Sequence, residues 1–190
     1  MLMQEKIILI GASTGGPGHL KKILSSLDSS FSTPIIIAQH MNPVFIKSFV
    51  KQFDDELPFK FYLADNRHDI DPFTMHICAT HCELNKREHY LKLENASGVI
   101  SHYNPSVDHL FNSAVKLCKE YDVLAILLTG IGHDGAQGLS DLKDAGATCL
   151  AESKESAIVY GMPKKAAELN SSIKVMNLNQ IIVYIKRFGD

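Results

Sequence analysis

The sequence has no excess of positive charge, which argues against one large class of function. Its 19 Lys and Arg residues stand against 21 Asp and Glu residues, and its nearest approach to a basic cluster is Lys86-Arg87. Domains that bind nucleic acid usually display a basic surface or stripe. With a formal net charge of −2, we expect no nucleic-acid partner.

Long apolar runs and a disulfide framework are also missing. A membrane-spanning helix needs about 20 consecutive apolar residues, and no stretch of the chain approaches that length. The apolar run between Lys6 and Gly11 is too short for a signal-peptide core. We therefore expect a cytoplasmic protein that does not insert into membranes. In such a reducing compartment the cysteines would be free thiols; they are Cys78, Cys82, Cys118 and Cys149.

What the chain does contain is an alternation of apolar strands and amphipathic helices. Its 190 residues, 45% of them hydrophobic, can form a substantial core, and we predict a single domain over residues 1–190. Apolar runs at residues 7–10, 34–39 and 123–128 are each followed by a helical pattern. The predicted fold class is α/β, a doubly wound and mostly parallel sheet flanked by helices.

Local signals predict several helix boundaries. Asn42 and Ser106 are suited to cap the start of a helix, and Gly146 is suited to end one in a left-handed conformation. The apolar stripe that follows Ser106 continues to Cys118, so we expect one long helix there. A last helix is expected to begin at Asn177.

The region from about residue 59 to residue 94 has a different pattern. Residues 59–63 and 89–93 alternate apolar and polar side chains, which is typical of half-exposed strands. We predict antiparallel hairpins here, added to the parallel sheet.

The same region contains a possible zinc cluster. Imidazole and thiolate groups are good zinc ligands, and four of them fall close together at His76, Cys78, His81 and Cys82. However, no second ligand pair follows at a zinc-motif spacing, and adjacent residues in a strand face opposite sides. We therefore favour ordinary core residues and predict no metal and no cofactor.

A glycine-rich turn follows the first predicted strand. Gly11 and Gly15 bracket Ser13 in the G-x-S-x-G spacing of a nucleophile elbow, which exposes the hydroxyl at the end of the strand. The alternative is a turn that binds a phosphate, or nothing, at the start of a helix.

His40 and Asp134 occupy places equivalent to that of Ser13, because each also follows a predicted strand. Separately, His40 could be a partly buried core imidazole and Asp134 a helix cap. The carboxyl ends of parallel strands meet at one edge of the sheet, where ligands bind. The coincidence of all three side chains there suggests a nucleophile, a base and an acid that form a catalytic triad.

Five separated segments carry a more specific signal. They are Ile10-Gly11-Ala12-Ser13-Thr14-Gly15-Gly16, Gln39-His40-Met41, Pro105-Ser106-Val107-Asp108-His109-Leu110-Phe111, Leu128-Thr129-Gly130-Ile131-Gly132-His133-Asp134-Gly135-Ala136 and Gly161-Met162-Pro163. In this order they resemble the catalytic domain of the bacterial chemotaxis protein-glutamate methylesterases, which are also protein-glutamine deamidases. The resemblance covers nearly the whole chain.

The resemblance implies a role for particular residues. Ser13 would be the nucleophile, His40 the base and Asp134 the third member of the triad. Thr14 lies beside the nucleophile, and the backbone N–H of Ile131 is a candidate oxyanion donor.

The chain also departs from the family pattern. Ile131 stands where the family often has Met, and Asn104 where an Arg often precedes Pro-Ser-Val-Asp. Residues 78–81 replace a longer Ala-Pro-Gly-x-x-His segment, which affects the expected substrate contacts. Family members usually carry an N-terminal receiver domain, whereas the first catalytic strand here begins by Ile7.

The function implied by the resemblance is hydrolysis of glutamate γ-methyl esters on chemoreceptor cytoplasmic helices, together with deamidation of receptor glutamines. Two alternatives belong to other classes. One is a nucleotide- or phosphate-binding Rossmann-like module that uses Gly15-Gly16-Pro17-Gly18, although the G-x-G-x-x-G spacing is absent. The other is a receptor-binding homologue without activity, against which the intact Ser13, His40 and Asp134 argue.

Overall fold

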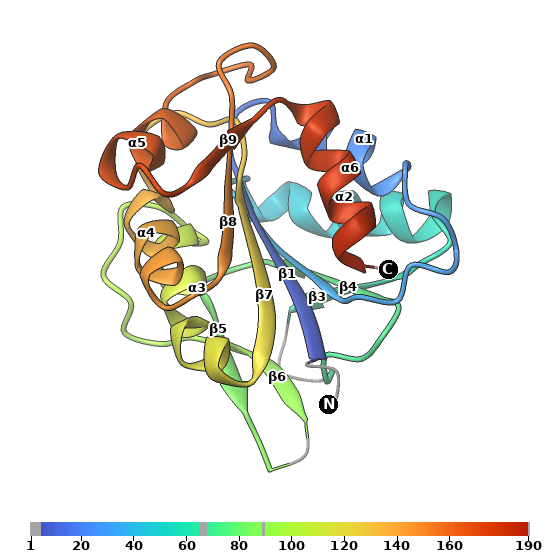
Figure 1. The fold of residues 1–190 in the computed structure, drawn as a ribbon. Coiled ribbons are helices and arrows are strands. Elements are labelled where there is room, and N and C mark those ends of the chain that lie inside the picture. Colours follow the sequence, from blue (N-terminus) through green and yellow to red (C-terminus); the bar gives the residue numbers. More distant parts are fainter. Residues whose placement is uncertain (1–4, 65–67, 89, 190) are drawn as a thin grey trace.

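The computed structural model describes residues 5–64, 68–88 and 90–189, and its centre is a seven-stranded sheet in which every neighbouring pair of strands is parallel (Figure 1). The predicted doubly wound α/β fold is therefore confirmed. In spatial order the strands are β3 (Lys60–Ala64), β4 (Thr74–Cys78), β2 (Ile35–Gln39), β1 (Glu5–Ala12), β7 (Tyr121–Leu127), β8 (Thr148–Glu152) and β9 (Lys174–Met176).

Helices cover both faces of this sheet. Figure 1 shows α1 (Gly16–Leu24), α2 (Pro43–Glu56) and α6 (Leu178–Gly189) on one side, and α3 (Val107–Ser113), α4 (Ala136–Asp144) and α5 (Met162–Leu169) on the other. Because side chains alternate along a strand, β1 contributes to the core on both faces of the sheet. Ile8 and Ile10 pack on the face of α1, α2 and α6, and Ile7 and Leu9 pack on the face of α3, α4 and α5. This explains why the central strands are apolar throughout.

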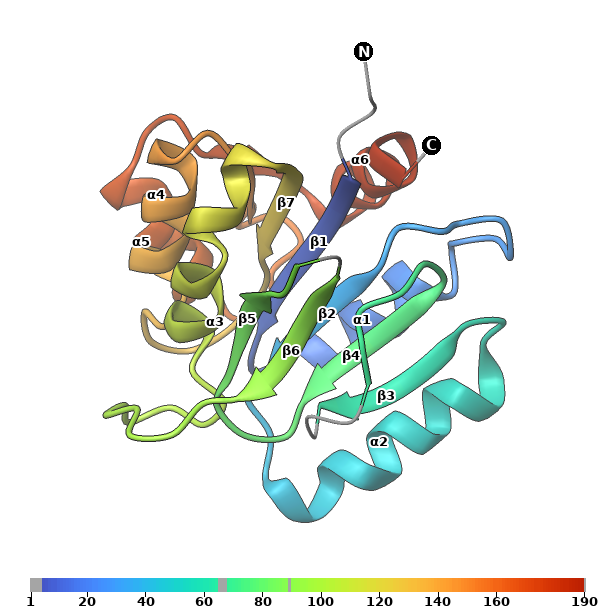
Figure 2. The ribbon, with the colours of Figure 1, turned by 90° about the horizontal axis from the view of Figure 1, so that it is seen from below.

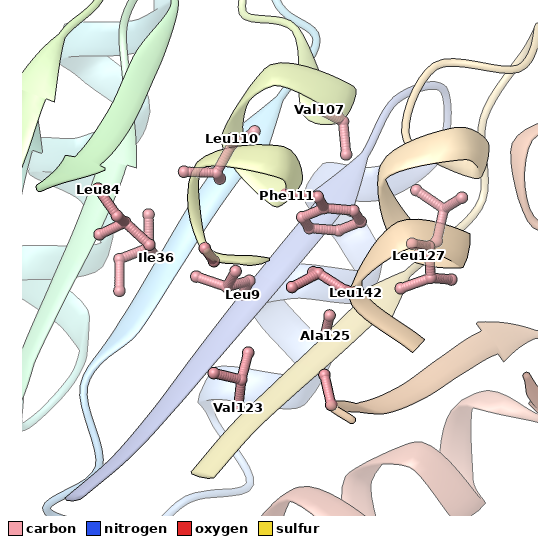
Figure 3. Packing of buried hydrophobic residues seen from close by; sticks show 14 of the residues in the cluster. Leu9, Ile36, Leu84, Val107, Leu110, Phe111, Val123, Ala125, Leu127 and Leu142 are labelled. Atoms are coloured by element: carbon pink, nitrogen blue, oxygen red, sulfur yellow. The ribbon is translucent and has the colours of Figure 1, made fainter. Parts of the chain in front are cut away.

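A two-stranded antiparallel sheet lies on the second face. It consists of β5 (Cys82–Lys86) and β6 (Leu91–Asn95), and Figure 2 shows it beside α3. Its buried residues Leu84 and Leu93 join the same apolar cluster as Leu9 and Phe111, part of which Figure 3 shows. The hairpin thus extends the helical layer over the sheet.

The prediction for residues 59–94 was partly wrong. Antiparallel pairing is found between β5 and β6, but these strands form a sheet of their own. Strand β3 instead pairs in parallel with β4 at the edge of the main sheet. Strand β3 is only partly buried, with Phe61 and Ala64 buried and Lys60 exposed, so its sequence resembles that of a half-exposed hairpin strand. Residue 89 of the predicted segment 89–93 lies outside the described residues.

Most of the predicted helix boundaries are confirmed. The side chains of Asn42 and Ser106 accept hydrogen bonds from the first turns of α2 and α3, and Gly146 has a φ of 102°. The long helix expected up to Cys118 is wrong, because α3 ends at Ser113 and a separate 3-10 helix, η1 (Val115–Lys119), follows. No helix in the described ranges is long and apolar enough to cross a membrane.

The order of the strands creates a switch point at β1. The chain proceeds from β1 outward through β2, β4 and β3, then returns to β7 on the other side of β1 and proceeds outward through β8 and β9. In doubly wound sheets, ligands bind beyond the carboxyl ends of the strands at such a point. Ser13 follows β1 and Asp134 lies in the loop after β7, so both flank it.

Candidate active site

The ends of β1 and β2 place Ser13 beside His40. The register of these parallel strands pairs Ala12 with Gln39, so Ser13 and His40 are the next residue of each strand. The backbone N–H of His40 donates to the carbonyl of Ala12 over 2.9 Å. The two predicted site residues are therefore fixed by the main sheet.

The turn after β1 requires glycine for two reasons. Gly15 has a φ of 86°, in the left-handed region that other residues rarely adopt. A Cβ atom on Gly16 would lie 2.1 Å from Oε1 of Gln39. The resulting tight turn leaves Ser13 half-buried and Thr14 exposed. The Ser13 hydroxyl makes no hydrogen bond to any described residue, so it remains available to a substrate.

His40 and Asp134 are joined directly. Nε2 of His40 lies 2.7 Å from Oδ2 of Asp134, and the carboxylate is only 2% exposed. Burial alone would raise the pKa of the Asp134 carboxyl, but hydrogen bonds from His40 and from two backbone N–H groups outweigh it and lower the pKa. Asp134 is thus held as a carboxylate facing the imidazole.

The two backbone donors come from the start of α3. The N–H groups of Val107 and Asp108 lie 2.7 Å and 3.0 Å from the Asp134 carboxylate, and the Ser106 hydroxyl lies 3.1 Å from it. A helix N-terminus favours a negative charge. The alternative that Asp134 caps the helix that follows it, α4, is therefore wrong. Gly135 holds the cap position of α4 without a side-chain hydrogen bond, and Asp134 instead accepts N–H groups at the start of α3.

Tyr103 is a neighbour of the site that the sequence patterns did not identify. Its ring stacks on that of His40, with centroids 5.0 Å apart and planes at 10°, and it meets the ring of His133 edge-on. Tyr103 precedes Asn104, where the chain departs from the family pattern. Its position in the site depends on a loop whose path no local pattern predicts.

The two predicted oxyanion and substrate residues, Thr14 and Ile131, belong to the turn after β1 and the loop after β7. Thr14 follows it directly, and its carbonyl accepts a hydrogen bond from the Thr129 hydroxyl. The Ile131 side chain is 62% exposed, and no described group accepts a hydrogen bond from its N–H. Gly130 brings this loop against Ser13, because a Cβ added to Gly130 would lie 2.7 Å from Cβ of Ser13.

A hollow of about 370 Å³ opens beside the carboxylate, with Ile100, Tyr103, His133 and Asp134 among its lining residues. A larger hollow, of about 790 Å³, lies against α6 at the amino ends of β1 and β7. None of the predicted site residues lines the larger one. The smaller hollow is therefore the one relevant to the chemistry of Asp134.

The residues considered as a zinc cluster are engaged elsewhere. Nε2 of His76 lies 3.0 Å from the Thr74 hydroxyl, His81 accepts a backbone N–H, and the Cys82 thiol donates to the carbonyl of Thr80. Within the part of the chain that the structure describes, no group of three or more His, Cys, Asp or Glu side chains could hold a metal ion.

Proteins of known name are similar to this chain over almost its whole length. A protein from Chromobacterium violaceum named protein-glutamate methylesterase/protein-glutamine glutaminase 2 is 37% identical over 186 residues, which cover 96% of this chain and 52% of that protein. A protein of the same name from Saccharophagus degradans is 34% identical over 181 residues, which cover 93% and 51%. The chain thus spans about half the length of the curated relatives it matches.

The solved structures include a match over nearly the full length of both chains. The crystal structure of the Thermotoga maritima CheB methylesterase catalytic domain superposes with a TM-score of 0.86 at 30% sequence identity. The match covers 97% of this chain and 99% of that one. A family model described as CheB methylesterase matches residues 8–185. The chain therefore belongs to the CheB methylesterase family.

Proposed function

We propose that the chain is a serine hydrolase of chemotaxis adaptation that removes methyl groups from glutamate γ-methyl esters of chemoreceptors. Ser13 is the nucleophile, His40 the base and Asp134 the third member of the triad. The observation that carries the proposal is the 2.7 Å contact between His40 and Asp134 beside the serine turn. The names of the relatives support the substrate class.

The chemistry follows from this contact. Because Asp134 engages Nε2 of His40, Nδ1 is the nitrogen left to accept the Ser13 proton. The serine oxygen attacks the ester carbonyl, and methanol leaves with the proton returned by His40. Water then hydrolyses the acyl-enzyme by the same route and releases the glutamate carboxyl group. Glutamine would give the same acyl-enzyme with ammonia as the leaving group, so we extend the proposal to receptor glutamines.

Two further groups have roles in this proposal. The N–H of Ile131, which has no acceptor among the described residues, would stabilise the oxyanion. Such a donor contributes about 10²- to 10³-fold in kcat. Thr14, exposed next to Ser13, would contact the substrate. The partner is the helical cytoplasmic part of a chemoreceptor.

The phosphate-binding alternative has less support. A phosphate at a helix N-terminus needs several free backbone N–H groups. At the start of α1, the Gly16 N–H donates to the carbonyl of Ser13, and Pro17 has no N–H. The alternative of an inactive homologue also has less support, because the contact between His40 and Asp134 that the mechanism needs is present.

Methanol release from methylated receptor membranes tests the proposal. Ser13→Ala should reduce the rate to background while the circular dichroism spectrum stays unchanged, since alanine fits the turn. Ser48→Ala, which removes an exposed hydroxyl on α2, is the matched control and should keep the wild-type rate. Comparable turnover by Ser13→Ala would rule out the serine mechanism.

A further inference from the structure

Among the residues that the structure describes, one fully buried carboxylate has no role in the proposed reaction. Glu152 is the last residue of β8, and its side chain is completely buried. A glutamate is almost never fully buried unless it is paired with other polar groups. Its partners therefore indicate what the residue does.

Three groups from different elements converge on Glu152. The backbone N–H of Thr129, just after β7, donates to Oε2 over 2.8 Å, and the Ser156 hydroxyl donates to Oε1 over 2.7 Å. Nδ1 of His19, from α1, lies 3.3 Å from Oε2. The carboxylate thus connects the loop after β7 to the helix that follows the nucleophile.

Thr129 in turn is hydrogen-bonded to the turn that carries Ser13. Thr129 is itself fully buried, and its carbonyl accepts the N–H of Ser13 over 3.0 Å. Its hydroxyl donates to the carbonyl of Thr14 over 2.8 Å and accepts the N–H of Val159. One residue held by Glu152 therefore binds the backbone of both Ser13 and Thr14.

We propose that Glu152 is a positioning residue for Ser13. It touches neither the substrate nor the reacting atoms, and it acts by fixing Thr129, which fixes the nucleophile turn against the loop of Ile131. A displacement of about 1 Å in such an arrangement can cost about 10²-fold in rate. The inference rests on the proposed serine mechanism, because it assigns a function to the geometry of Ser13.

Kinetics of two variants at Glu152 test this role. Glu152→Ala removes the acceptor of the Thr129 N–H and should lower kcat by about 10- to 100-fold, with little change in KM. Glu152→Gln keeps an oxygen that can accept this N–H, so it should recover most of the wild-type kcat. A fluorophosphonate, which modifies activated serines without a receptor substrate, gives a second measurement. Its rate of reaction with Ser13 should fall and recover in parallel with kcat.

Thr74→Val is the matched control for a further variant, Thr129→Val, because both lose a buried threonine hydroxyl. Thr74 is buried at the amino end of β4 and donates to the carbonyl of Asp71. Its loss should lower stability and leave kcat and the labelling rate unchanged. Thr129→Val is a second test, which remains available if Glu152→Ala does not fold. It removes the hydrogen bond to the Thr14 carbonyl and should lower both kcat and the rate of labelling.

The outcomes separate this inference from the proposed function. Wild-type kcat and labelling in folded Glu152→Ala would overturn the positioning role, as would a Glu152→Gln variant no better than Glu152→Ala. If Glu152→Ala does not fold, normal rates in Thr129→Val would overturn it. Failure of the serine mechanism has a different signature: methanol release that persists in Ser13→Ala.

Discussion

Asp134 combines two tasks at the level of a single residue. It accepts a hydrogen bond from His40 and also binds the first N–H groups of α3. We expect Asp134→Asn to lower kcat by about 10³- to 10⁴-fold, since the amide favours the wrong imidazole tautomer. Steady-state methanol release would measure this loss. Asp55→Asn, which changes an exposed carboxylate on α2, should have no effect.

A smaller loss would assign Asp134 a different role. If kcat of Asp134→Asn fell by less than about tenfold, or roughly 1.4 kcal/mol of activation free energy, the residue would be only a helix cap. A fall in the free energy of unfolding would then be its main effect.

His76 provides a prediction about the pH dependence of stability. Burial, with a smaller contribution from the charge of His68, lowers its pKa from 6.5 to about 4. Since the pKa of His76 is lower in the folded protein than in the unfolded chain, the unfolded chain binds the proton first as the pH falls. The folded state is therefore favoured fully above pH 6.5 and loses this advantage as the pH falls toward 4. We expect this to cost roughly 3 kcal/mol of unfolding free energy. Urea unfolding between pH 7 and pH 4 would measure it.

His76→Gln is the variant that isolates this contribution, because it keeps a polar side chain beside Thr74 but cannot titrate. Its unfolding free energy should vary less with pH than that of the wild type in the same range. An identical pH dependence in both proteins would show that other groups are responsible.

Among the elements, the β5–β6 hairpin is the one whose contribution is easiest to isolate. Leu93 in β6 is 1% exposed and packs in the cluster beneath α3. Leu93→Ala should cost about 2 to 5 kcal/mol, because it removes buried apolar surface and leaves a cavity. Thermal or urea unfolding would measure this. Val183→Ala, at a half-exposed position of α6, should change stability far less, and equal losses would contradict the packing argument.

Elements were predictable where the signal was local. The caps at Asn42 and Ser106 were predicted because each acts on residues within three positions of itself. The end of α3 at Ser113 was missed because the apolar stripe continues past it, into the separate helix η1. The orientation of β3 was missed because its alternation records exposure and carries no information about its partner. The three-residue strand β9 was also missed, since its residues are largely exposed.

In the candidate site, too, features with a signal in the sequence were predicted and features set by long-range contacts were not. The rule that parallel strands end at one edge predicted that His40 and Asp134 would be close, and they are. Tyr103 and Glu152 were not identified, because their roles depend on contacts from distant loops. The bond of Glu152 to Ser156 is local, but its bond to Thr129 joins β8 to the loop after β7, 23 positions away.

At the scale of the whole molecule, the position of β1 between β2 and β7 determines how late during folding the site can form. Ser13 and His40 need only the nearby pairing of β1 with β2, whereas His40 and Asp134 are 94 positions apart. Distant pairings of this kind form slowly, because a long loop must close first. A refolding chain could therefore pair Ser13 with His40 for some time before Asp134 reaches them. Recovery of turnover would then mark the closure of the sheet, later than the return of helical signal.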